Sequence, residues 1–368
     1  MYDELLQVDT GGMWRNARGM SSTELVALAD DVAVVATGNT TWIVETVTNQ
    51  ALNKVAEWMI GAGLSLSVRK TEGVILTTKR GYRRPNFSIL GSHIEFKERI
   101  SYLGVELQRV LGFRAHVESA AARAQTTSTA LSRLMPNIGG PRQNKRSLLA
   151  TVVTSKLLYA APIWGAAMAF NRNVVTLDRP QKTIAIRTIM AYRTVSTAAV
   201  LVIAGMIPAH LLSWERCERY KRRHEPESAR TKLEIRAETM RKWQAKWANE
   251  SNSRWTRRLI QDINSWRGRN HGSADFHMTQ LLSNHGCFGE YLHRIGKLDA
   301  ATCVDCQKPV DNAEHVFFVC GRWWKQWREL EVELEEDLSP DNIVRNMLKK
   351  RSNWDAVSSF VNLVQSTS

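Results

Sequence analysis

Three cysteines and one histidine lie close together in the segment CVDCQKPVDNAEHVFFVC, with the spacing C-x2-C-x8-H-x4-C. A gap of two residues lets two thiolates close a turn onto one ion, and a histidine and a cysteine about one helical turn apart can complete a tetrahedron. Zinc prefers that arrangement, and four protein ligands leave no open position for water. The spacing therefore predicts a structural zinc knuckle at residues 303–320, with the ligands Cys303, Cys306, His315 and Cys320.

The total of 5 cysteines is odd, which is unlike a disulfide framework. Cys217 and Cys287 lie outside the cluster and have no comparable setting. The alternative to a metal site is that three thiols stand near a histidine by chance.

A second candidate site is a pair of adjacent aspartates, Asp30 and Asp31, in the segment LVALADDVAVVATG at 25–38. Short apolar runs on both sides predict two strands, so the pair is expected at the turn of a tight hairpin. Carboxylates mounted there could hold Mg2+ or Mn2+ against a nucleoside triphosphate and a primer hydroxyl, as two-metal nucleotidyl transfer requires. The alternative is turn chemistry alone, because aspartate is favoured in turns.

About 40 residues further on, Lys70 lies in the segment GLSLSVRKTEGVIL. A cation at this point could protonate or stabilise a departing pyrophosphate. The alternative is an ordinary solvated lysine, since lysine is rarely buried.

The composition is that of a globular protein with polyanionic partners. Hydrophobic residues make up 43% of the 368 residues and charged residues 23%, with a formal net charge of +14. Such a charge favours nucleic acid as a partner. No apolar run reaches the roughly 18 residues that a membrane-spanning helix needs, and the first residues lack the pattern of a signal peptide. We therefore expect an intracellular protein with no membrane partner.

The positive charge is concentrated between Trp214 and Asn270, where 16 Lys and Arg face 8 Asp and Glu among five tryptophans. Cations neutralise phosphates and tryptophan rings can stack on unpaired bases, so the segment suits a track for a nucleic-acid strand. The alternative is an amphipathic helical pair whose tryptophans face the core. The candidate binding residues are Arg241, Lys242, Trp243, Lys246, Trp247, Arg254, Trp255, Arg257 and Arg258.

Residues 1–107 alternate helix and strand patterns. Apolar residues at helical spacing predict a helix over 41–63 that stops at Gly61 and Gly63. Strands are expected at 72–78 and 100–107. This part of the chain is thus expected to be mixed α/β.

From residue 108 the pattern changes to long helices. Residues 108–223 are expected to be mostly α, and a polar stretch at 224–230 is a linker candidate. Residues 224–368 then form a basic region that contains the predicted zinc knuckle. The helices are expected over 113–135, 147–169, 177–193 and 196–223.

Several of these segments, in this order, resemble a known family. LVALADDVAVVATG resembles the A-D-D catalytic hairpin of the reverse transcriptases of non-LTR (LINE-type) retrotransposons. GLSLSVRKTEGVILTTKR is similar to the K-T-E segment that follows it, and ISYLGVEL to the Y-L-G element that grips the primer. The segments AYRTVSTAAVLVIAGMIPAHLL and NHGCFGEYLHRIG, leading into the CCHC module, are similar to the region after the polymerase. The resemblance covers nearly the whole chain and is closest to the insect elements that insert into ribosomal RNA genes.

The resemblance implies an α/β palm remnant of a polymerase, a mostly α thumb and a helical C-terminal region with a small CCHC zinc module. It assigns the catalytic metals to Asp30, with Asp31 in support, and places Lys70 near the triphosphate. Tyr102, Leu103 and Gly104 would seat the primer end. Such polymerases copy an RNA template into DNA from a nicked chromosomal target, with dNTPs as substrates. That activity implies a nuclear location, and the parent polyprotein usually also carries an endonuclease.

The chain departs from the family pattern in one respect. Family members have a further catalytic aspartate on a strand well upstream of the hairpin. Only 29 residues precede Asp30, and Asp3 and Asp9 are too close to replace it. The expectation is a C-terminal fragment of a longer polyprotein that does not polymerise alone. Two other hypotheses stay open: a noncatalytic zinc-containing RNA or DNA binding protein, and a structural helical protein with a zinc-stapled end.

Overall fold

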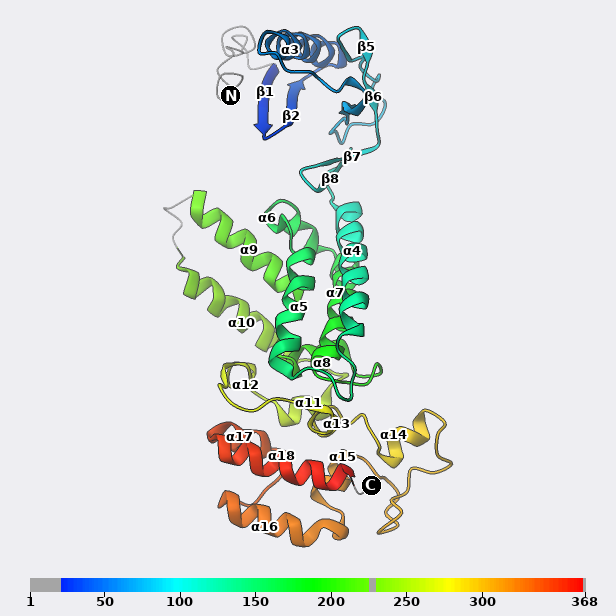
Figure 1. Cartoon of the computed structure of the whole chain (residues 1–368), viewed down its shortest axis with the longest axis vertical. Coiled ribbons are helices and arrows are strands. Elements are labelled where there is room, and N and C mark those ends of the chain that lie inside the picture. Colours follow the sequence, from blue (N-terminus) through cyan, green and yellow to red (C-terminus); the bar gives the residue numbers. More distant parts are fainter. Residues whose placement is uncertain (1–20, 225–229, 367–368) are drawn as a thin grey trace. The chain divides into compact units, whose positions relative to one another are not determined.

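The computed structural model describes residues 21–224 and 230–366, which fall into two compact units, Met1–Phe113 and Arg114–Ser368 (Figure 1). Asp3, Asp9 and most of the predicted linker lie outside the described residues. Within the described ranges, no single helix has both the length and the apolar composition to cross a membrane. One bent pair, 143–157 with 161–169, passes that test only when its two parts are taken together.

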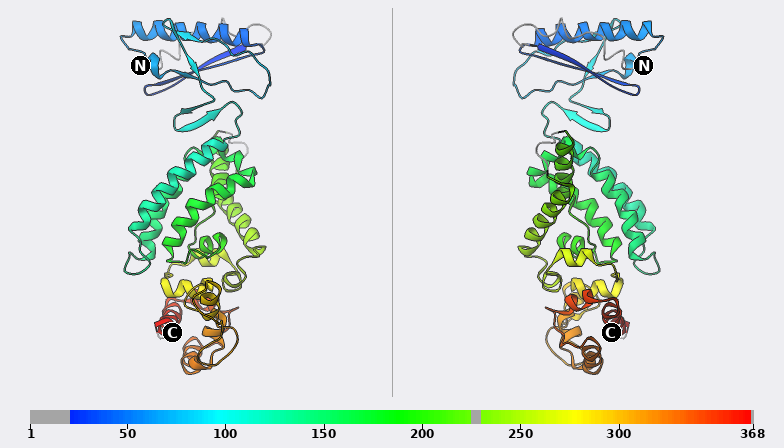
Figure 2. Two further views of the ribbon diagram at one scale, coloured as in Figure 1. Left: turned by 90° about the vertical axis from the view of Figure 1, so that its right-hand side faces the viewer. Right: turned by 90° about the vertical axis from the view of Figure 1, so that its left-hand side faces the viewer.

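The first unit is built on an antiparallel hairpin of β1 (Ser21–Leu28) and β2 (Asp31–Gly38). Helix α3 (Thr41–Gly61) lies over this hairpin (Figure 2) and begins where the Thr40 hydroxyl accepts a hydrogen bond from the Ile43 N–H at 3.2 Å. The predicted hairpin and the predicted helix at 41–63 are confirmed. A small core joins α3 to β2 and to later segments: Leu52, Ala56, Ile89 and Ile94, with Val34, Leu66, Val68 and Phe87 packed against them.

The other strands of this unit are short, and they form three separate pairs. Strand β3 (Glu72–Gly73) pairs in parallel with β6 (Glu95–Phe96), and β4 (Ser88–Ile89) pairs antiparallel with β5 (Ser92–His93). The prediction of a strand at 72–78 is therefore wrong beyond Gly73, where the hydrogen-bonded pairing of β3 ends. The segment 100–107 is not one strand either. It is a hairpin of β7 (Arg99–Tyr102) and β8 (Val105–Gln108), because Leu103 and Gly104 turn the chain.

The second unit begins with α4 (Arg114–Arg133), α5 (Gln143–Leu157) and α7 (Asn171–Thr188), which pack together. Arg146 of α5 is fully buried and pairs with no carboxylate among residues 21–224 and 230–366. Its guanidinium donates to backbone carbonyls of Met135, Pro136, Pro141 and Arg187. This arginine thereby ties the connection between α4 and α5 to the end of α7, because each buried donor has an acceptor.

Two of the predicted long helices are broken. The helix expected at 147–169 divides into α5, α6 (Ala161–Trp164) and the 3-10 turn η2 (Gly165–Ala169), because Ala160 is left-handed and Pro162 follows it. The helix expected at 196–223 divides into α8 (Thr197–Ile203) and α9 (Ala209–His224), separated by Gly205 at φ 65° and by Pro208. The helix expected at 113–135 is confirmed as α4.

The rest of the second unit is a set of helices on one continuous core. That core runs from Ala185 in α7 to Val364 in the last helix, so the expected boundary at 223/224 does not separate two compact units. The helices are α10 (Lys232–Ala248), α11 (Arg254–Leu259), α12 (Ile263–Gly268), α13 (Phe276–Ser283), α14 (Gly289–Arg294), α15 (Ala313–Phe318), α16 (Trp324–Leu334), α17 (Ile343–Lys349) and α18 (Arg351–Ser366), with a 3-10 turn, η4 (Gly321–Trp323), before α16.

Candidate metal centre and catalytic hairpin

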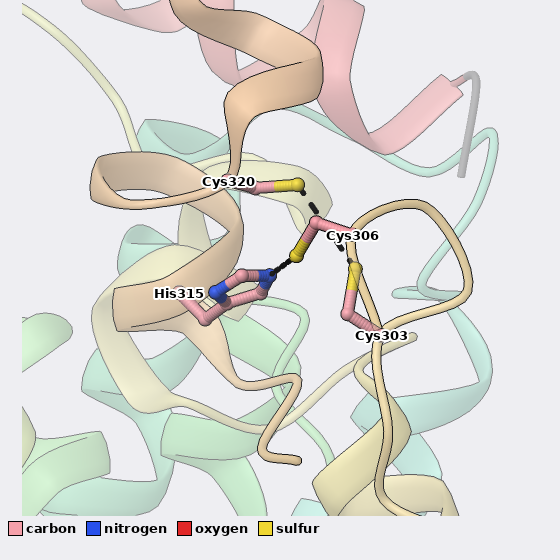
Figure 3. A group of neighbouring side chains, drawn as sticks. All are labelled: Cys303, Cys306, His315 and Cys320. Carbon is pink, nitrogen blue, oxygen red and sulfur yellow. Dashed lines mark hydrogen bonds between the residues drawn. The ribbon is translucent and has the colours of Figure 1, made fainter. Parts of the chain in front are cut away.

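The four predicted zinc ligands converge (Figure 3). Their ligand atoms all lie within 4.8 Å of one another; Cys303 Sγ is 4.0 Å from Cys320 Sγ, and Cys306 Sγ is 3.3 Å from His315 Nε2. A tetrahedral zinc ion with bonds of about 2.3 Å to sulfur and 2.0 Å to nitrogen separates two sulfurs by roughly 3.8 Å and sulfur from nitrogen by roughly 3.5 Å. The two measured separations thus lie close to those that one tetrahedral ion needs, and the remaining ligand atoms are within 4.8 Å.

Local backbone geometry explains how these ligands meet. The Cys303 N–H donates to the Lys308 carbonyl at 2.9 Å and the Gln307 N–H donates to the Cys303 carbonyl at 3.0 Å, which closes the turn that carries both thiols. Gln307, at φ 59°, supplies the left-handed step of that turn. His315 is held in the first turn of α15, where its N–H donates to the capping side chain of Asn312 at 2.9 Å. The Cys320 N–H then donates to the His315 carbonyl at 2.8 Å.

The electrostatic setting also suits a cation. Burial raises the pKa of the Cys320 thiol to about 11, and the nearby Cys303 adds to the rise. A hydrogen bond with the Lys308 backbone lowers the pKa of the exposed Cys306 thiol, and burial lowers the pKa of His315, which favours its neutral form. A bound divalent cation would stabilise the thiolates against this burial and crowding, so the donor set fits zinc.

The knuckle packs directly on the helical core. Cys303 and Cys320 belong to the continuous core of the second unit, as does Phe317 between them, whose ring meets those of Phe288 and Phe360 edge-on. Arg322 of η4 also forms an ion pair with Asp305 at 2.9 Å. The metal site is therefore coupled to the packing of α15, of α18 and of the start of α14.

The aspartate pair lies at the tip of the β1–β2 hairpin. Leu28 pairs with Asp31, so Ala29 and Asp30 form a two-residue turn, with Ala29 in the left-handed region at φ 54°. Both aspartates are exposed. Among residues 21–224 and 230–366, the CCHC cluster is the one place where three or more His, Cys, Asp or Glu side chains converge on a common point. Within those ranges no third carboxylate joins the hairpin pair.

Lys70 ends the 3-10 turn η1 (Val68–Lys70) and is exposed. Val68 at the start of this turn packs on the same small core as Val34 of β2, which anchors the lysine-bearing turn and the hairpin to one cluster. In the described part of the chain, no hydrogen bond or ion pair joins Lys70 to Asp30 or Asp31.

The predicted primer grip is the turn of the β7–β8 hairpin. Tyr102 pairs with Val105, and the two turn residues have positive φ, 47° at Leu103 and 78° at Gly104. Such a turn matches the twist of its strands, but it strains a leucine, which rarely adopts this conformation. The Tyr102 hydroxyl is buried with no hydrogen-bond partner among the described residues.

The tryptophans of the basic segment do not form a stacking track, contrary to the prediction. Trp243 and Trp247 are 3% and 2% exposed and lie in the core, and the indole of Trp247 donates to the Ile260 carbonyl at 2.7 Å. Trp255 is half-buried, donates to the Leu281 carbonyl at 2.6 Å and meets Phe318 edge-on. Rings that are enclosed as those of Trp243 and Trp247 are cannot stack on bases, so the amphipathic alternative holds for these two residues. Trp255 packs against the same core with part of its ring exposed.

Most of the predicted cations of this segment have partners within the protein. Arg258 binds Asp341 with two hydrogen bonds at 2.9 and 2.8 Å and Glu314 with one at 2.8 Å, which raises its pKa. Arg241 pairs with Glu238, Lys242 lies 3.4 Å above the Trp214 ring, and Arg257 donates to the Ala248 carbonyl at 2.5 Å. Lys246 and Arg254 are exposed, and no ion pair is formed by either within the described ranges.

Sequence reasoning missed a cleft of about 1110 Å³ in the second unit. We call it the basic cleft. One wall is the segment 259–271 and the other runs from Asp341 to Arg351. The run Lys349, Lys350 and Arg351 was the available signal, but it lies far from the cation-rich segment at 214–270.

Comparison with curated proteins gives consistent relatives. A Pol polyprotein from the type-1 retrotransposable element R1 2 of Nasonia vitripennis is 27% identical over 326 residues, which are 82% of this chain and 79% of that protein. A putative 115 kDa protein in the element R1DM of Drosophila melanogaster is 26% identical over 322 residues, 81% of this chain and 31% of that protein. An RNA-directed DNA polymerase from the mobile element jockey of Drosophila funebris is 28% identical over 155 residues, 41% of this chain and 16% of that protein.

By these matches the chain is similar to retrotransposon Pol polyproteins and, over a shorter stretch, to an RNA-directed DNA polymerase. The similarity that extends over about 80% of the chain is to proteins of the type-1 (R1) retrotransposable elements of insects. The chain spans most of the first relative and under a third of the second. No family model matches the sequence, and no solved structure matches it.

Proposed function

We propose that the chain supplies part of an RNA-directed DNA polymerase whose catalytic hairpin is β1–β2. One observation carries the proposal: two adjacent aspartates occupy the exposed tip of a tight hairpin, in a chain with a polymerase among its relatives. The described residues 21–113 would then belong to the palm and α4 to α9 to the thumb. Partners would be an RNA template, a DNA primer or target, and dNTPs, and action on chromosomal DNA would place the protein in the nucleus.

Asp30 and Asp31 fit a divalent cation that arrives with its substrate. Mg2+ is commonly bound by one or two carboxylates together with substrate phosphates, so an exposed pair does not need a closed cage. When bound, Mg2+ or Mn2+ would neutralise charge on the triphosphate and activate the primer hydroxyl. Lys70 would stabilise the leaving pyrophosphate, and the turn at Leu103 and Gly104 would position the primer end.

The resemblance assigns a third carboxylate to the site, and among the described residues none converges with Asp30 and Asp31. We therefore expect the chain alone to lack polymerase activity, and to gain it when the upstream Pol segment of a relative is added. This expectation separates a catalytic part from a protein that only binds nucleic acid.

The test is primer extension on an RNA template by the complemented chain. Loss of a group that only orients a metal ligand costs about 10- to 100-fold in activity, so Asp30→Ala should lower the rate at least about 100-fold. Glu24→Ala is the matched control, because Glu24 is an exposed carboxylate on β1 away from the turn. Extension that survives Asp30→Ala, or that falls equally with Glu24→Ala, would refute the catalytic assignment.

A second candidate function is noncatalytic nucleic-acid binding, favoured by the preformed CCHC cluster. In this case the knuckle and the basic surface of the second unit would do all of the binding. RNA affinity that falls steeply with salt, in a complemented chain that never extends a primer, would support this function over catalysis.

A further inference from the structure

The basic cleft lies entirely within the second unit. Its volume of about 1110 Å³ is large enough for a stretch of polymer rather than for a single ion. Arg269 and His271 stand on the wall formed by 259–271, and the other wall carries the end of α17 and the start of α18. His271 joins the walls, since its Nε2 is 3.0 Å from the Met347 carbonyl and its ring meets Trp354 edge-on.

The charge of the lining is strongly positive. Two acids are present, and both are already engaged: Asp262 accepts from the Asn264 and Ser265 N–H groups at 3.1 and 2.9 Å, and Asp341 holds Arg258. Against them stand five cations: Arg269, Arg345, Lys349, Lys350 and Arg351.

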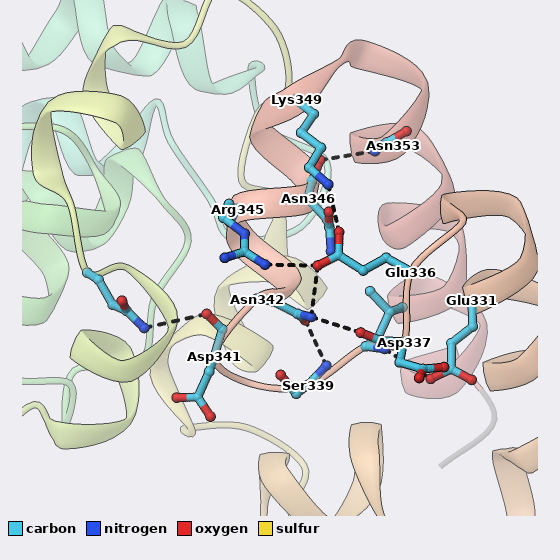
Figure 4. A network of polar contacts seen from close by, with 12 residues as sticks. Glu331, Glu336, Asp337, Ser339, Asp341, Asn342, Arg345, Asn346, Lys349 and Asn353 are labelled. Carbon is cyan, nitrogen blue, oxygen red and sulfur yellow. Dashed lines mark hydrogen bonds and ion pairs between the residues drawn. The ribbon is translucent and has the colours of Figure 1, made fainter.

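Glu336 orders two of these cations from outside the cleft (Figure 4). It accepts from Arg345 at 2.8 Å and from Lys349 at 2.6 Å, which holds both side chains on one side of α17. The other three cations have weaker internal partners or none. Arg351 is 3.7 Å from Asp355, an exposed pair of the kind that contributes little, and Lys350 forms no ion pair within the described residues.

Arg269 has a setting that suits a ligand-binding group. Its guanidinium lies 3.9 Å from the centre of the Trp266 ring and 5.2 Å from that of Trp354, and it donates to the Trp266 carbonyl. Its Nε is buried with no partner among the described residues. Burial lowers its pKa to about 10, so it stays cationic at neutral pH. The planar group is thus fixed in orientation by the rings beneath it.

The two tryptophans that Arg269 contacts do not line the cleft and are not available to bases. Trp266 and Trp354 are 0% and 2% exposed, because Arg269 covers them. A strand in the cleft would therefore meet mainly cations and polar groups, and the ring of His271 in the lining is held by the Met347 carbonyl and Trp354. Contacts of this kind bind phosphates without reading sequence.

We propose that the basic cleft binds the sugar–phosphate backbone of a nucleic-acid strand, independently of its sequence. The cleft proposal rests on the proposed function, because it locates a binding site for the nucleic acid on which that function acts. It differs from the sequence prediction in location: the contact is made by Arg269, Lys350 and Arg351, not by the tryptophans of α10 and α11.

The test compares two double variants that remove equal charge. Lys350→Gln with Arg351→Gln alters the cleft, and Lys297→Gln with Lys325→Gln removes two exposed cations of the same unit outside it. Each phosphate contact contributes about 0.7 to 0.9 to the slope of log affinity against log salt, so the cleft variant should lose roughly 1.4 to 1.8 of that slope. At about 0.15 M salt this loss corresponds to a 10- to 30-fold weaker affinity.

Affinities for labelled single-stranded RNAs of two unrelated sequences are measured between about 50 and 200 mM salt, with poly-glutamate as a second probe. The proposal is supported if the cleft variant weakens both RNAs alike while the control stays within about twofold of wild type. The cleft proposal is overturned if both variants lose the same RNA affinity, and this result leaves the proposed function standing. It is also overturned if the cleft variant loses only poly-glutamate binding, which would indicate an acidic protein partner. Absence of RNA binding in the unaltered chain would overturn the cleft together with the nucleic-acid-binding function, whereas primer extension would remain a separate question.

Discussion

The assignment of Trp247 to the core makes a prediction that opposes the base-stacking alternative. Trp247 is 2% exposed and donates to the Ile260 carbonyl. In Trp247→Leu the smaller side chain leaves part of the indole volume empty, at about 2–3 kcal/mol. The unpaired Ile260 carbonyl adds about 1–2 kcal/mol. The free energy of unfolding should therefore fall by about 3–5 kcal/mol, which lowers the melting temperature of a unit this size by roughly 6–20 °C.

The matched control is Trp324→Leu, because Trp324 is 68% exposed and its replacement should change stability by less than about 0.5 kcal/mol. Melting is followed by circular dichroism, and RNA affinity is measured well below the melting temperature. We expect the Trp247 variant to bind RNA as tightly as the unaltered chain. A ring stacked on a base contributes about 1–3 kcal/mol to binding. Unchanged melting with a fivefold or greater loss of RNA affinity, a loss of about 1 kcal/mol, would refute the core assignment.

Two further predictions concern the metal and pH. Zinc analysis should find about one ion per chain, lost in Cys303→Ser and kept in Cys287→Ser, whose exposed thiol lies outside the cluster; a Cys303 variant that keeps its zinc would contradict the site. Burial lowers the pKa of His210 from 6.5 to about 4. Between these values the unfolded chain binds a proton that the folded chain does not, so stability should fall as pH drops through this window. The free energy of unfolding, measured by urea denaturation, should fall less with pH in His210→Gln than in the unaltered chain, by up to about 3 kcal/mol. A pH profile identical to that of the unaltered chain would contradict this prediction.

The features that could be predicted from sequence are those set by neighbouring residues. The hairpin around Asp30 follows from alternating apolar residues, and the CCHC cluster follows from ligand spacing that two short backbone turns impose. Helices α3 and α4 also have strong local periodicity. In each case the contacts that form the element join residues close in the chain.

The features that could not be predicted depend on distant contacts. The burial of Trp247 is decided by Ile260 and the core around it, and the neutralisation of Arg258 by Asp341, which lies 83 residues away. The breaks at Ala160 and Gly205 are left-handed steps inside otherwise apolar helical patterns. The basic cleft joins Arg269 to Lys350 and Arg351, and no local pattern relates these residues.

The most direct test of the central claim asks whether a divalent cation binds at the tip of β1–β2. In the complemented chain with template, primer and dNTP, iron(II) is substituted for magnesium, and hydrogen peroxide with ascorbate is added. Iron(II) reduces the peroxide to hydroxyl radical, which should cleave the backbone beside the bound ion, while ascorbate regenerates iron(II). Cleavage should map to the turn that carries Asp30 and Asp31 and should disappear in Asp30→Asn with Asp31→Asn. Cleavage that is absent from this turn, or that persists in the double variant, would contradict the assignment of the hairpin as the catalytic metal site.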